Sequence, residues 1–81
     1  MSTLANEQQP QACRVSYDHS SIIVELIDGR SISAPLTWFP RLANAQPEQL
    51  DNWMLLGNGE GIHWPDIDED ISVTGLLEGN H

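Results

Sequence analysis

The chain of 81 residues has no lysine, one cysteine and no long apolar run. A lone cysteine, Cys13, cannot form a disulfide within the chain, so a reducing setting is expected. No stretch approaches the roughly 20 apolar residues that a membrane-spanning helix needs. Residues 1–11 also lack the basic region and the apolar core of a signal peptide. We therefore expect a cytoplasmic protein that does not enter a membrane.

Basic side chains are scarce, because twelve carboxylates face only three arginines and the formal net charge is -9. Phosphate backbones are bound by clustered lysine and arginine side chains, and these three arginines are scattered. Direct nucleic-acid binding is therefore not expected. Opposite charges steer association, so a basic protein partner fits this composition better. The alternative is an acidic surface that only keeps a small protein soluble.

The length of the chain allows one small domain. A chain this short buries about 60–65% of the surface that its unfolded form exposes, so modest stability is expected. Residues 1–11 are polar and aperiodic, which predicts a disordered tail ahead of a single domain over residues 12–79. Three tryptophans add weight to the apolar core of that domain.

The first part of the domain reads as strands. Cys13 and Val15 alternate with polar residues, which predicts a half-buried strand with the Cys13 thiol buried and inert. A hairpin is predicted around Gly29. A two-residue loop would mix its faces, whereas a three-residue loop with Gly29 in the left-handed conformation pairs Val24 with Ile32. We favour the three-residue loop.

Two short helices are predicted between the hairpins. Thr37 is expected to cap the first, with Pro40 in its first turn, where backbone amides lack partners. Pro47 is expected to begin the second helix at its favoured first position. Trp38 and Arg41 are open to two interpretations, core packing or the partly exposed aromatic and arginine contacts that dominate interfaces.

A second hairpin is predicted around residues 58–59, where Asn-Gly is a strong turn sequence. A two-residue loop places Leu55 opposite Ile62 and buries the flanking tryptophans together. A three-residue loop would instead align Met54 and Leu56 with Ile62. We favour the first register.

Residues 66–70 carry four carboxylates in five positions. The alternate aspartates resemble the start of a calcium loop, which also needs glycine at its sixth position and glutamate at its twelfth. Ile71 and Leu77 stand there, so no calcium site is predicted. The run leads to a last helix, capped by Ser72. Carboxylates ahead of a helix are favoured by its positive end, by about 0.3–1 kcal/mol each, which accounts for one or two of the four.

No catalytic or metal-binding set is apparent. His63 is the best candidate for acid–base chemistry or ligation. Its potential partners are poorly placed, because His19 lies in a turn and His81 is terminal. We therefore expect no cofactor, no metal and no enzymatic activity.

Several blocks of this sequence resemble a known bacterial family, the domain-of-unknown-function family 2442. The blocks are residues 28–30, 35–42, 52–53, 61–65, 68–71 and 75–77. The resemblance implies a small α+β domain, often encoded beside a second small protein in arrangements like those of toxin–antitoxin pairs. Some relatives continue into a helix-turn-helix domain that this sequence lacks, so DNA binding of its own is not implied.

The combined prediction is an α+β fold, with antiparallel hairpins packed against two or three short helices. The predicted function is a non-enzymatic interaction module, the antitoxin-like member of a bacterial pair, with a basic partner such as the product of an adjacent gene. One alternative is a mimic of nucleic-acid charge that blocks a basic nucleic-acid-binding protein, and another is a small metal-dependent enzyme. The predicted contact residues are Trp38, Arg41, His63, Trp64, Asp66, Asp68, Glu69 and Asp70.

Overall fold

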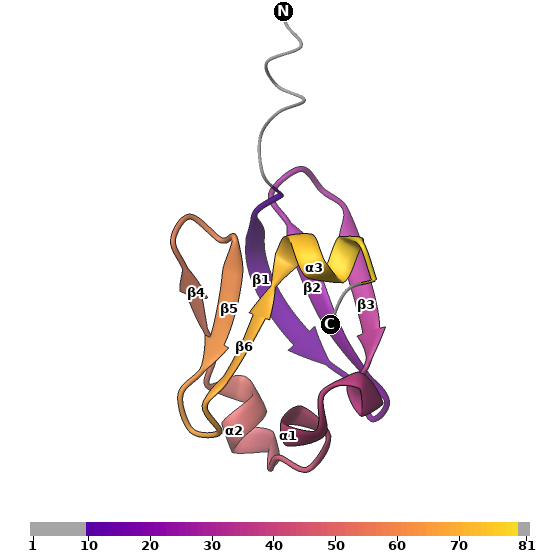
Figure 1. The fold of residues 1–81 in the computed structure, drawn as a ribbon, viewed down its shortest axis with the longest axis vertical. Coiled ribbons are helices and arrows are strands. Elements are labelled where there is room, and N and C mark those ends of the chain that lie inside the picture. Colours follow the sequence, from indigo (N-terminus) through magenta and orange to yellow (C-terminus); the bar gives the residue numbers. More distant parts are fainter. Residues whose placement is uncertain (1–9, 80–81) are drawn as a thin grey trace, which may run out of the picture.

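A computed structural model describes residues 10–79, which form two three-stranded antiparallel sheets and three short α-helices (Figure 1). The first sheet contains, in this order, β1 (Ala12–Tyr17), β2 (Ser21–Leu26) and β3 (Ser31–Pro35). The second contains, in this order, β4 (Met54–Leu56), β5 (Gly61–Trp64) and β6 (Glu69–Ser72). The helices are the 3-10 helix η2 (Leu36–Trp38), α1 (Pro40–Ala43), α2 (Pro47–Asp51) and α3 (Val73–Leu77). The predicted α+β class is confirmed.

The start of the described chain is tied to the first sheet. Residues 1–9 of the predicted tail lie outside the described residues. The carbonyl oxygen of Gln11 accepts a hydrogen bond from the backbone amide of Ile27 at 2.9 Å. Regular contacts therefore begin one residue before β1. Across residues 10–79, no helix combines the length and the apolar character that crossing a membrane requires.

The first hairpin has the predicted register. Val24 pairs with Ile32. The loop holds three residues, because the amide of Leu26 donates to the carbonyl oxygen of Arg30 at 2.7 Å. Gly29 has a φ of 97°, in the region that favours glycine. Loop chemistry and the apolar alternation thus agree on one pairing.

The prediction that Cys13 is buried was wrong. Ala12 pairs with Leu26 and Arg14 with Glu25, so a β-bulge at Cys13 interrupts the ladder. The extra residue resets the alternation, and Ala12 and Val15 enter the core while Cys13 is exposed. Burial in β1 is therefore set by its pairing with β2.

The helix after the first sheet starts later than predicted. Thr37 lies within η2 and does not cap α1, whose N-cap is Phe39 without a side-chain hydrogen bond. The Phe39 amide donates to the carbonyl oxygen of Leu36 at 2.9 Å, which closes a 3-10 turn first. Pro40 and Pro47 do stand in the first turns of α1 and α2, as predicted.

The second hairpin keeps the favoured register with a longer loop. Leu55 pairs with Ile62, as predicted, but the ladder ends at the pair of Leu56 and Gly61. Residues 57–60 therefore form a four-residue loop rather than a two-residue one. Trp53 precedes β4 and is half-buried, outside the ladder.

Strand β6 was not predicted from the sequence. It pairs with β5, with Ile71 opposite Ile62 and Glu69 opposite Trp64. Aspartate and glutamate are depleted in strands, so an acidic run does not predict one. Ser72 then caps α3 as predicted, because its hydroxyl oxygen accepts a hydrogen bond from the Gly75 amide at 3.2 Å.

The two sheets meet where the loop of the second hairpin touches β1. The Ala12 amide donates to the carbonyl oxygen of Gly59 at 2.7 Å. A Cβ atom on Gly59 would lie 2.4 Å from the Ala12 carbonyl oxygen, so only glycine allows this approach. Helix α3 packs against β3 and β6. The core draws on both sheets and all helices; its buried residues are Ala12, Val15, Ile22, Val24, Leu26, Ala34, Leu36, Phe39, Leu42, Leu50, Ile62, Trp64, Ile71, Val73 and Leu76.

Candidate protein-interaction site

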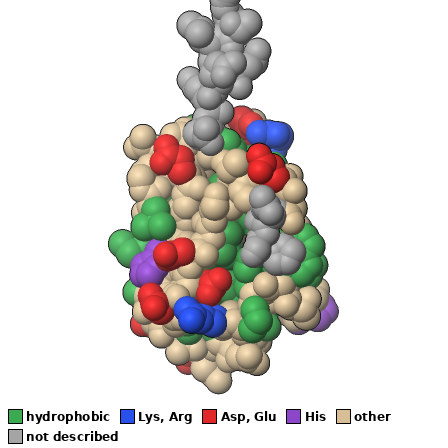
Figure 2. Space-filling model, viewed as in Figure 1, with side chains coloured by type: hydrophobic (Ala, Val, Ile, Leu, Met, Phe, Trp, Pro, Cys, Tyr) green, Lys and Arg blue, Asp and Glu red, His purple; other side chains and the backbone are tan. Residues whose placement is uncertain are grey.

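The four carboxylates of residues 66–70 lie in the turn between β5 and β6 and at the start of β6. Asp66, Asp68 and Asp70 are exposed, whereas Glu69 is half-buried. Asp68 has a φ of 54°, which bends the chain into β6. Figure 2 shows acidic side chains gathered over this end of the molecule, with arginine and histidine side chains among them.

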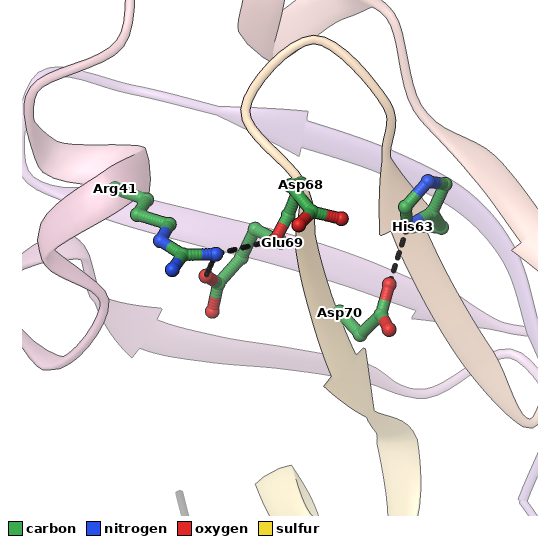
Figure 3. A network of polar contacts seen from close by, with 5 residues as sticks. All are labelled: Arg41, His63, Asp68, Glu69 and Asp70. Carbon is green, nitrogen blue, oxygen red and sulfur yellow. Dashed lines mark hydrogen bonds and ion pairs between the residues drawn. The ribbon is translucent and has the colours of Figure 1, made fainter.

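Arg41 joins helix α1 to the start of β6 (Figure 3). Its Nη1 atom donates to the carbonyl oxygen of Asp68 at 2.6 Å and lies 3.9 Å from Oε1 of Glu69. An ion pair this open contributes little free energy, so the bond to the carbonyl oxygen is the firmer contact. Arg41 thus neutralises part of the charge of Glu69.

His63 and Asp70 face each other across β5 and β6. Nδ1 of His63 contacts Oδ1 of Asp70, and the histidine is half-buried while the carboxylate stays 67% exposed (Figure 3). His63 lies on the opposite face of β5 from the fully buried Ile62 and Trp64, as its position in the sequence predicts. The pair can present a proton donor and a carboxylate to a partner.

The remaining carboxylates have few partners of their own. Oδ2 of Asp66 accepts a hydrogen bond from Nδ2 of Asn52 at 3.1 Å, which links the turn to the end of α2. Asp68 uses its backbone carbonyl oxygen for Arg41 and turns an exposed carboxylate outward. The three aspartates of the acidic segment therefore face water, and only Glu69 is partly turned inward.

Trp64 does not belong to this surface, contrary to the prediction. Its side chain is fully buried, and its indole Nε1 donates to the carbonyl oxygen of Leu50 at 3.1 Å. The alternation of β5 that places His63 outside places Trp64 inside. The favoured hairpin register had already placed Trp64 on the buried side with Ile62, so its inclusion among the contact residues was wrong.

Trp38 is the aromatic residue that reaches the surface here. It is 38% exposed and packs edge-on against Phe39, with ring centroids 6.4 Å apart. A pocket of about 290 Å³ separates this aromatic pair from β6; its lining residues are Trp38, Phe39, Pro40, Glu69, Asp70, Ile71, Ser72 and Leu76. The fold therefore brings Trp38 beside the predicted Glu69 and Asp70.

Two exposed apolar residues in β4 were not among the predicted contacts. Met54 and Leu56 are 51% and 40% exposed. Met54 pairs with His63, so it extends the cross-strand row of His63 and Asp70. Their exposure follows from the favoured register, because Leu55 faces inward and the residues on either side of it must face outward.

The residues can hold cationic groups but do not form a metal centre. In the stretch from Pro10 to Gly79, no three His, Cys, Asp or Glu side chains are grouped so that they could bind a metal ion. The available chemistry is exposed carboxylate oxygens, one histidine and one indole ring. Such groups suit the recognition of a basic surface.

Comparison with known proteins identifies the family. Residues 12–81 match the family described as protein of unknown function (DUF2442). The chain belongs to this family. The match confirms the resemblance carried by the sequence blocks, and no curated protein matches the chain.

Two solved structures are similar to this DUF2442 chain. A protein of unknown function from Rhodospirillum rubrum, solved by crystallography, is 33% identical and has a TM-score of 0.77, with 90% of each chain covered. An uncharacterized protein from Chromobacterium violaceum, solved by NMR, is 28% identical and has a TM-score of 0.75. That match covers 95% of this chain and 72% of the other.

Proposed function

We propose that this DUF2442 protein is a non-enzymatic interaction module that binds a basic protein partner through an acidic face. The acidic face consists of Trp38, Arg41, His63, Asp66, Asp68, Glu69 and Asp70. The observation that carries the proposal is the exposure of Asp66, Asp68 and Asp70 together, in the turn before β6 and at the start of that strand, near a partly exposed tryptophan.

Charge supports a basic partner. The chain has a formal net charge of -9 and no lysine, so the field around the acidic face is negative. A field of this kind raises the association rate with a positively charged protein. Arg41 is engaged with β6, so it does little to reverse the sign of the face.

The side chains also support a specific contact rather than a merely soluble surface. Tryptophan and arginine are enriched among the residues that dominate binding energy, and Trp38 and Arg41 both border the carboxylates. Asp68 and Asp70 present oxygens that a guanidinium or ammonium group can bind.

The sequence resemblance extends the proposal to the biological setting. Relatives in the family are often encoded beside a second small protein, so the partner we propose is the product of the adjacent gene. In this assignment the protein is the antitoxin-like member of a bacterial two-protein pair in the cytoplasm.

The test is calorimetry with the purified product of the adjacent gene. We expect binding that weakens when salt rises from about 0.05 M to about 0.5 M, because the Debye length shortens from roughly 14 Å to roughly 4 Å. The double variant Asp68→Asn with Asp70→Asn is expected to bind about tenfold more weakly at low salt. Tight binding that is unchanged by added salt and by the double substitution would refute the acidic contact.

Glu60→Gln provides a charge-matched control for the single variant Asp68→Asn. Glu60 is exposed and lies in the loop at the opposite end of β5 from the acidic turn. The substitution removes one negative charge without touching the acidic face. Equal losses for Glu60→Gln and Asp68→Asn would show that net charge alone matters, which also contradicts a defined binding face.

A further inference from the structure

Strand β6 forms one edge of the second sheet, because the strand order is β4-β5-β6. Along an antiparallel strand, the amide and carbonyl groups of one residue bond to the neighbouring strand, and those of the next residue point away from it. The Val73 amide donates to the carbonyl oxygen of Glu60 at 3.0 Å, which fixes the phase of this alternation. Counting back from Val73, Ile71 and Glu69 bond to β5. Asp70 and Ser72 therefore direct their backbone groups away from β5.

Arg41 lies where the chain enters β6. The carbonyl oxygen of Asp68, in the turn one residue before the strand, accepts the hydrogen bond from Nη1 of Arg41 at 2.6 Å. Arg41 thus occupies the position next to the start of β6. Beyond it, among residues 10–79, no strand pairs with the outer side of β6.

The pocket defined above borders this same edge. Glu69, Asp70 and Ser72 line it together with Trp38. Its volume of about 290 Å³ is at the lower limit of pockets that hold small-molecule ligands, which are roughly 300–1,000 Å³. One long side chain from a partner fits this space better than a separate metabolite.

We propose that the outer edge of β6 binds an extended basic segment of the partner by β-strand addition, with one arginine side chain in the pocket against Trp38. The backbone of Asp70 and the amide of Ser72 supply the hydrogen bonds, as in other complexes where a peptide extends a sheet, whereas the Ser72 carbonyl oxygen serves the first turn of α3. A guanidinium group stacks on an indole ring and pairs with carboxylates, so Trp38 and Glu69 favour arginine. This inference rests on the proposed function and names the mode of recognition.

The other exposed edge is a poorer candidate for a basic segment. Strand β4 has three residues, and its exposed side chains are Met54 and Leu56, without carboxylates among them. A second copy of this chain is also disfavoured at β6, because each copy carries a formal net charge of -9. Charge complementarity therefore favours a basic partner at the edge of β6.

The test uses a blocked pentapeptide, Val-Arg-Val-Arg-Val, as the probe and amide NMR spectra of the whole protein as the readout. We expect the largest shifts at the amides of Asp70 and Ser72 and at the indole of Trp38. A peptide with glutamate in place of arginine is expected to cause none. Shifts centred on Leu55 in β4, or no shifts at all, would overturn the inference.

Backbone and charge contributions are separated by two variants at one site. Asp70→Asn removes the carboxylate, and Asp70→Pro also removes the outward amide while sparing the bonds to β5. We expect about tenfold weaker peptide binding for Asp70→Pro than for Asp70→Asn, the equivalent of one hydrogen bond. Equal affinities would contradict strand addition.

A modified peptide covers the case in which Asp70→Pro does not fold. Methylating the backbone nitrogen of the central valine blocks one edge of the peptide, and methylating the backbone nitrogen of an arginine blocks the opposite edge. Loss of binding with only one of the two methyl groups supports strand addition, and equal binding of the two methylated peptides overturns it.

The proposed function and the strand addition can fail separately. Salt-dependent binding of the adjacent-gene product that requires Asp68 but is unchanged in Asp70→Pro and Trp38→Leu would overturn strand addition alone. Absence of binding to that product, together with shifts at Asp70 and Ser72 from the arginine peptide, would overturn the assigned partner alone.

Discussion

The indole nitrogen of Trp64 donates a hydrogen bond to the carbonyl oxygen of Leu50 at 3.1 Å, and both residues are buried. The bond joins β5 to the end of α2. It satisfies a buried indole donor and a helix-terminal carbonyl oxygen in a region closed to water. A second hydrogen bond holds the acidic turn near α2. It runs from Asn52, one residue after that helix, to Asp66.

Replacing Trp64 by phenylalanine should strongly destabilise the fold. Trp64→Phe leaves a cavity and an unpaired Leu50 carbonyl oxygen, which together cost about 2–4 kcal/mol of the free energy of unfolding. Urea denaturation followed by circular dichroism measures this loss. The same change at the partly exposed Trp38 is the control and should cost less than about 1 kcal/mol. Equal losses at the two sites would show that Trp64 is not the central core residue.

Gly59 and Gly29 form a matched pair for testing the contact between the sheets. Both have a φ of 97°, but a Cβ atom at Gly29 meets nothing within 4 Å, whereas at Gly59 it meets the backbone of Ala12 at 2.4 Å. Gly29→Ala should cost only the strain of a left-handed conformation, about 1–3 kcal/mol. Gly59→Ala should cost at least about 2 kcal/mol more, at the large end for single substitutions. Thermal unfolding compares the two, and similar values would contradict the close approach.

The Asp18 carboxylate should make stability depend on acid pH. Its Oδ1 atom accepts hydrogen bonds from the amides of Ser20 and Ser21, at 2.9 Å and 2.8 Å, which lower the pKa of Asp18 below its usual 3.8. A carboxyl group whose pKa is lowered by folding stabilises the folded state above its unfolded pKa, and that stability is lost as pH falls through the folded pKa.

Asp18→Asn should therefore be less stable than the unmodified protein at neutral pH and approach it below about pH 4. The asparagine keeps an oxygen acceptor for the two amides, so the substitution isolates the charge. Urea midpoints measured from pH 7 down to about pH 2.5 provide the comparison. A difference that stays constant over this range would show that the charge of Asp18 is not responsible.

The Cys13 thiol should be accessible in the folded protein. Cys13 is exposed at the β-bulge of β1, so a thiol reagent such as Ellman's reagent should react with it fully without denaturant. Cys13→Ser should change the free energy of unfolding by less than about 0.5 kcal/mol, because no core contact is lost. A thiol that reacts only after urea is added would contradict the exposure of Cys13 and support the burial that strand alternation predicted.

Much of the local structure was accessible from the sequence because it depends on neighbouring residues. Gly29 admits the left-handed conformation of a three-residue loop, and this conformation together with the apolar alternation sets the hairpin register. Pro40 and Pro47 mark helix starts, and Ser72 caps α3, for equally local reasons. The family blocks and the acidic charge are likewise properties of the sequence itself.

The candidate site depended on contacts between distant segments. Asp68, Glu69 and Asp70 look like a solvated loop, and only pairing with β5 makes Glu69 to Ser72 an edge strand. Exposure of Cys13 was decided by the bulge in β1, and the partner of the Trp64 indole nitrogen by the packing of β5 on α2. Trp38 and Glu69 line the same pocket, although they are 31 positions apart in the chain (38 to 69). Sequence fixes the conformations that neighbours impose, whereas the direction of each side chain depends on which strand or helix lies beside it in space.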